Sequence, residues 1–64
     1  MMIEFKYDTQ LLIEGENLKK EEISKHINKN LKGDCLIVVQ VGNLVKIHFH
    51  TNEPWFLLQY CATV

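Results

Sequence analysis

Apolar and polar side chains alternate along three segments of this chain, and each segment predicts a β-strand. In residues 3–13, "IEFKYDTQLLI", the alternation is typical of a half-buried strand. Residues 35–41, "CLIVVQV", are apolar on both faces for much of their length, which predicts a second, more fully covered strand. Residues 44–51, "LVKIHFHT", alternate again and predict the third.

The segment between the first two strands has the periodicity of a helix. Its apolar residues fall near one stripe, while lysines and glutamates line the rest, so the charges indicate a solvated helix face. Asn17 can cap this helix, which we expect to run from about Leu18 to Leu31. Gly33 follows at a position where a glycine with positive φ commonly ends a helix.

A second helix is predicted after the third strand. Asn52 can cap it, and Pro54 suits its first turn. The apolar run "WFLLQYCA", residues 55–62, supplies its body. We expect Trp55 and Phe56 to pack in the core, with docking of further chain or another domain as the alternative.

The dipeptide Gly42-Asn43 predicts a two-residue hairpin between the second and third strands. Such a loop fixes the register, because residues that face each other across the hairpin then share one face of the sheet. The expected pairs are Val39 with Lys46, Ile37 with His48, and Cys35 with His50. The opposite face is apolar and suits coverage by the helices. Both histidines therefore fall on the open face.

The element order strand, helix, strand, strand, helix predicts an α+β, ferredoxin-like βαββα sandwich with both helices on one face. In that topology an antiparallel hairpin lies beside the N-terminal strand, and the first and third strands are neighbours. Asp8 then comes beside His48 and His50. The usual final strand is missing, which leaves the first strand as an open edge.

Composition narrows the functional classes. The chain has 64 residues, which we assign to one small α+β domain spanning residues 1–64, and its formal net charge of -1 argues against nucleic acid as a partner. We expect no membrane insertion, because no apolar run approaches the roughly 20 residues that a span needs. A cytoplasmic location is expected, with Cys35 and Cys61 as small, semi-buried thiols.

Polar side chains on the open face suggest two kinds of chemistry. Two imidazoles at His48 and His50 with the Asp8 carboxylate have the layout of a catalytic zinc site, and Cys35 can serve as a fourth or substitute ligand. Lys46 beside the histidines makes a small cationic face suited to a phosphate. From spacing alone, ordinary solvated strand residues remain the alternative for the histidines and for Lys46.

Apolar side chains share this open face. They are Leu12, Ile37, Val39 and Val41. A contiguous exposed patch of this kind usually marks an interface, so we expect a homo-oligomer, most simply a dimer. A merely irregular surface of a small domain is the alternative.

Two stretches, "FKYDTQLLIEGENL" and "KGDCLIVVQVGNLVKIHFHTNEP", carry motifs in a characteristic order: Tyr-x-Thr-Gln, Gly-Asp-Cys-Leu, and Lys-x-His-x-His-Thr-Asn-x-Pro. Over nearly the whole chain they resemble the middle domain of the large, ATP-binding subunit of bacterial fatty acid kinase, a relative of dihydroxyacetone kinases. The sequence departs from the family at position 8, where Asp stands and many members carry Cys. It also stops where members continue through a glycine into another strand.

The resemblance implies a fragment of a larger multidomain kinase-type phosphotransferase. It implies a dimerisation and linker module between a nucleotide-binding domain and a domain that engages a fatty-acid-carrying partner protein. His48 and His50, with Lys46 beside them, would then contribute to acyl phosphate formation with Zn²⁺ or another divalent metal. The chain has three glycines and no phosphate loop, so ATP would act only through a domain absent from it, and we expect no enzyme activity in isolation. The alternative is a small cytoplasmic protein-interaction or regulatory domain with incidental surface histidines.

Overall fold

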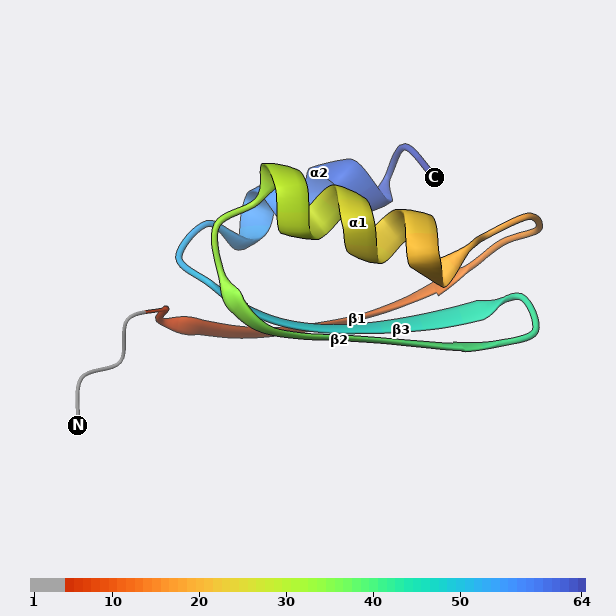
Figure 1. Ribbon diagram of the computed structural model, residues 1–64, viewed down its shortest axis with the longest axis horizontal. Helices are drawn as coiled ribbons and strands as arrows, with labels where there is room; N and C mark the ends of the chain where they lie inside the picture. Colours follow the sequence, from red (N-terminus) through yellow and green to blue (C-terminus); the bar gives the residue numbers. More distant parts are fainter. Residues whose placement is uncertain (1–4) are drawn as a thin grey trace.

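The computed structural model describes residues 5–64 and has the predicted order of elements. The elements are β1 (Tyr7–Glu14), α1 (Lys20–Asn30), β2 (Asp34–Val41), β3 (Leu44–Thr51) and α2 (Pro54–Cys61). The three strands form one antiparallel sheet in the order β1-β3-β2, and both helices lie on the same side of it (Figure 1). The α+β, ferredoxin-like arrangement is confirmed. The predicted beginning of the first strand, at residue 3, lies outside the described residues.

The register agrees with the sequence prediction along most of the sheet. Val39 lies opposite Lys46, and Ile37 lies opposite His48. The hairpin turns through Gly42 and Asn43, and Gly42 has a φ of 57°, a conformation that glycine adopts without strain. On its other side β3 pairs with β1 over the whole length of β1. The predicted neighbours, β1 and β3, are therefore confirmed.

The core lies between the sheet and the helices, and the central strand supplies the largest share of its buried residues. Alternate residues of β3 are buried: Val45, Ile47, Phe49 and Thr51. The helices add Ile23, Ile27 and Leu57. The two helices also meet through the rings of His26 and Tyr60, which stack with centroids 3.8 Å apart. Neither described helix is long and apolar enough to cross a membrane.

The start of α1 differs from the prediction that Asn17 caps it. Asn17 adopts a left-handed conformation, with a φ of 64°, in the turn before the helix. The backbone N–H of Lys20 instead donates to Oε1 of Gln40 at 3.0 Å, and the same side-chain amide donates to the Leu18 carbonyl at 2.6 Å. A tertiary partner on β2 thus takes the place of the local cap.

The start of α2 is also held differently. Asn52 was expected to cap the helix, but Glu53 is the capping residue by position, and Oδ1 of Asn52 accepts the Lys6 N–H at 2.7 Å. Pro54 begins the helix as predicted. The buried Thr51 hydroxyl donates to the Lys32 carbonyl at 2.7 Å and accepts the Glu53 N–H at 3.1 Å, so it joins the loops before β2 and after β3.

Three further residues lie elsewhere than expected. Trp55 and Phe56 are on the outer side of α2, with 55% and 46% of their surface exposed, so the prediction of core packing is wrong. Cys35 is exposed, whereas Cys61 is half-buried as predicted, and burial raises the pKa of the Cys61 thiol.

Gly33 does not act as the expected positive-φ helix end. The helix ends at Asn30, and the backbone of the next residue, Leu31, is extended. Gly33 instead lies against β3, where a Cβ would overlap the carbonyl oxygen of His50 and the ring of Phe49. This position needs glycine because two segments approach closely there.

Gly33→Ala should therefore lower the free energy of unfolding by about 1–3 kcal/mol, because the added methyl group must displace the end of β3. Urea unfolding followed by circular dichroism measures this. Gly15→Ala is the matched control, since a Cβ there meets only the Leu18 side chain at an ordinary 3.6 Å. Equal midpoints for the two variants would contradict the close approach at Gly33.

Candidate metal centre

Three polar side chains meet on the open face, at one end of the sheet. Asp8 on β1 lies directly opposite His50 on β3, and His48 is two residues earlier on the same face of β3. Oδ1 of Asp8 is 3.1 Å from Nε2 of His48 and 3.5 Å from Nε2 of His50. The two Nε2 atoms are 3.1 Å apart. The structure therefore brings together the three residues that the sequence predicts as metal ligands.

The distances within this triangle suit a small divalent cation. Zinc–nitrogen bonds of about 2.0–2.1 Å in a tetrahedral site place neighbouring ligand atoms about 3.3 Å apart. The three observed separations, 3.1, 3.1 and 3.5 Å, bracket that value. Two imidazole nitrogens with one carboxylate oxygen are also a donor set that zinc accepts, whereas Mg²⁺ favours oxygen ligands. The residues present thus fit a zinc-like ion.

The triangle is accessible from one side. The side chains of His48, His50 and Asp8 are 25%, 33% and 59% exposed. One carboxylate oxygen and two imidazole nitrogens face one another here, an arrangement that a shared proton or a cation stabilises. An ion held by these atoms would keep a position facing solvent, where water or a substrate oxygen can bind.

Cys35 does not lie opposite His50, in contrast to the predicted register. The pairing shifts between Asp34 and Ile37, so that Asp34 faces His50. Cys35 occupies the irregular position and has a φ of 55°. A β-bulge of this kind adds one residue to a strand and changes which side chain faces the partner. The prediction failed because a hairpin turn fixes the register only up to the first bulge.

Asp34, Cys35 and His50 form a second group of possible ligand atoms. These atoms lie within 4.8 Å of one another, and Oδ1 of Asp34 is 3.7 Å from Nδ1 of His50. The negative charge of Asp34 is the main factor that raises the pKa of the Cys35 thiol. Sequence reasoning missed Asp34, and the only signal for it was its place beside Cys35.

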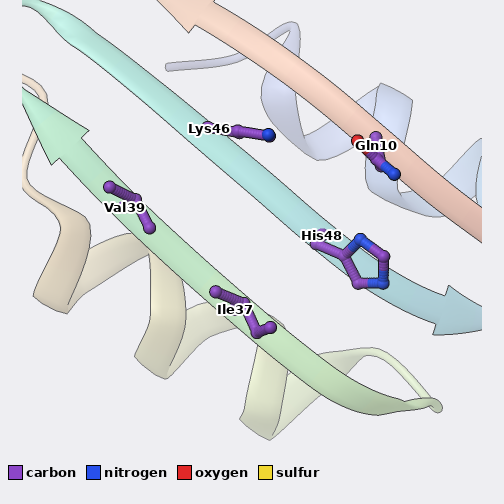
Figure 2. A pocket seen from close by; sticks show the side chains of 5 residues that line it. All are labelled: Gln10, Ile37, Val39, Lys46 and His48. Atoms are coloured by element: carbon purple, nitrogen blue, oxygen red, sulfur yellow. The ribbon is translucent and has the colours of Figure 1, made fainter.

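A shallow hollow of about 200 Å³ lies beside His48 on the open face. It is lined by Gln10, Ile37, Val39, Lys46 and His48 (Figure 2). Lys46 and His48 come from the central strand, Gln10 comes from β1, and the two apolar residues come from β2. Gln10 lies opposite His48 and was missed, although it shares the strand parity of Asp8. The hollow thus combines a cation, an amide and apolar walls.

The residues predicted as an interface are exposed on this face. Leu12, Ile37, Val39 and Val41 have 67%, 57%, 48% and 72% of their surface accessible. Leu12 and Val39 lie on either side of Lys46, and Ile37 lies opposite His48. The apolar patch and the polar cluster therefore adjoin each other.

Comparison with known proteins identifies the family. A family model for the middle domain of FakA-like fatty acid kinase subunits matches residues 4–64. The chain belongs to this family. No curated protein and no solved structure matches it significantly.

Membership in the FakA-like middle-domain family confirms the resemblance seen in the sequence motifs. The matched range includes all of the open-face residues described above. The chain is therefore a module related to fatty acid kinase. At position 8 this chain places a carboxylate oxygen against both imidazoles.

The environment of Cys35 predicts its reactivity. Because the Asp34 carboxylate raises the pKa of this thiol, Asp34→Asn should lower that pKa and increase the thiolate fraction at a given pH. Alkylation by iodoacetamide at pH 8 should then be faster, measured by mass spectrometry in a Cys61→Ser background. Glu21→Gln, an exposed charge change on α1, is the control and should leave the rate unchanged. An equal rate in the Asp34 variant would contradict this electrostatic effect.

Proposed function

We propose that this domain holds a divalent cation, preferably Zn²⁺, on Asp8, His48 and His50, and serves as a module of a fatty-acid-kinase-related protein in acyl phosphate formation. The observation that carries the proposal is the convergence of one carboxylate oxygen and two imidazole nitrogens within 3.5 Å of one another. The family match supports the kinase context. ATP and the acyl group would come from other domains or a carrier partner.

The chemistry of such a site would be electrostatic. A divalent ion there would offset negative charge on a carboxylate or phosphoryl oxygen of the substrate. Lys46, two residues before His48 on the same face, adds a fixed positive charge beside the hollow. The amide of Gln10 can donate a hydrogen bond to an oxygen that enters there. These residues would bind and orient an anionic group, while phosphoryl transfer itself requires the nucleotide-binding domain.

Zinc should stabilise the folded chain. At a free zinc concentration 100 times the Kd, the free energy of unfolding should rise by about 2.7 kcal/mol. For a domain of this size that is a rise of more than about 10 °C in Tm, measured by thermal melts with and without zinc. His48→Ala and His50→Ala should each lose most of the rise, because two ligands hold an ion much less well than three.

His26→Ala is the matched control for this zinc effect. His26 lies on α1 with its ring stacked on Tyr60, so its removal can lower the starting Tm and leave the zinc-dependent rise intact. An unchanged melt of the wild-type chain at excess zinc would refute the metal site. The histidines would then be incidental, as in a plain interaction domain.

We also propose that two copies associate through the open face. The exposed apolar side chains on β1 and β2 adjoin one another across Lys46, which is the layout of an interface with a small polar centre. In a twofold dimer each copy contributes the same patch. Ile37, Val39 and Lys46 also line the hollow, so the partner copy would enclose an anionic group bound there, with the metal ligands at the edge of the contact.

Val39→Asp should weaken association by about tenfold or more, because each copy would bring an unpaired carboxylate into the contact. Sedimentation velocity over a range of concentrations measures this. Leu58→Asp is the control, since Leu58 lies on α2 and has an exposed fraction close to that of Val39, 53% against 48%. A monomeric wild-type chain at high concentration would refute the interface.

A further inference from the structure

The β-bulge at the beginning of β2 has a feature that calls for an explanation. Cys35 adopts a φ of 55°, which is unfavourable for a residue with a side chain. The bulge brings Asp34 opposite His50, where regular pairing would have placed Cys35. Bulges often re-aim a side chain next to a functional site. The strain at Cys35 is thus linked to the placement of one carboxylate.

That carboxylate faces the far edge of the His50 ring. Oδ1 of Asp34 is 3.7 Å from Nδ1 of His50, while Nε2 of the same ring points to Asp8 and His48. The ring therefore lies between two carboxylates, one at each nitrogen. The separation of 3.7 Å is an ion-pair distance, and a shift of about 1 Å by the exposed Asp34 side chain would bring it to hydrogen-bond length.

We infer that Asp34 is a positioning residue that accepts the Nδ1–H of His50 and so keeps Nε2 as the free, ligating nitrogen. A neutral imidazole carries one N–H, and its partner decides which nitrogen holds it. Histidines that bind metals commonly donate their second nitrogen to a carboxylate in this way. The inference rests on the proposed metal site, because it assigns the outer support of one of its ligands.

A second ion on Asp34, Cys35 and His50 is the competing explanation of the same cluster. It would require His50 to bind one ion through each nitrogen, and hence to lose its remaining N–H. A hydrogen bond from that N–H to Asp34 avoids this loss. The geometry therefore favours one ion, with Asp34 acting through His50.

Zinc affinity tests the inference. Competition with a chromophoric chelator should show zinc binding weakened about 10–100-fold in Asp34→Ala. Asp34→Asn should recover part of that loss, because its amide oxygen still accepts the Nδ1–H without the charge. Glu21→Ala, which changes the net charge equally from the far side of the domain, should leave the affinity unchanged. Equal affinities for wild type and Asp34→Ala, or two zinc equivalents per wild-type chain, would overturn the inference.

The tautomer of His50 without metal gives a second readout that does not depend on zinc. Long-range ¹H–¹⁵N NMR spectra of the wild-type chain should show Nδ1 protonated, and Asp34→Ala should shift the population toward the Nε2–H form. Wild type in the Nε2–H form would refute the role of Asp34 even if zinc binds. Conversely, a chain that shows the Nδ1–H form but binds no zinc would refute the proposed function and leave the contact with Asp34 established.

Discussion

The alternation of side chains along β3 is the constraint on which the rest of the structure depends. Val45, Ile47 and Phe49 point into the core, and the residues between them point to the open face. A slip of one residue would bury the histidines and expose the core, so packing energy fixes the register of the strand. Because β3 pairs with both β1 and β2, the same energy fixes the neighbours of His48 and His50.

Hydrogen bonds and close backbone packing also stabilise the end of the sheet that carries the candidate site. The Thr51 hydroxyl bonds to backbone groups of Lys32 and Glu53, and thereby joins the segments on either side of β3. Because Gly33 has no side chain, the segment just before β2 can lie directly against β3. Phe49 and Thr51, the β3 side chains in these contacts, are buried and flank His50 along the strand. The same short segment of β3 therefore contributes to the core on one face and to the candidate site on the other.

Regular periodicity made much of this fold and site predictable. Strict alternation and a Gly-Asn turn were enough to pair the strands, and the ferredoxin-like topology then placed Asp8 beside His48 and His50. Each of these steps follows from geometry that repeats along the chain. Asp8, both histidines, Ile37 and Val39, which were placed by these rules, lie where the sequence predicted.

The predictions failed where a local irregularity or a tertiary contact overrode the local pattern. The amide of Gln40 holds the start of α1, which left Asn17 to form a turn. The bulge at Cys35 leaves no signal in the periodicity of the sequence. The sequence therefore did not predict that Asp34, and not Cys35, lies opposite His50. Trp55 was expected in the core because it is hydrophobic, but hydrophobicity does not tell which side of a mostly apolar helix faces the sheet.

The three converging atoms of Asp8, His48 and His50 belong to two paired strands and not to loops. The ladder of backbone hydrogen bonds has already restricted the motion of those strands when the domain folds. An ion bound by these atoms would therefore cost little additional conformational entropy. The affinity and selectivity of such a site would be set by the spacing of the paired strands, and the stability of the fold would limit how well the site discriminates between ions.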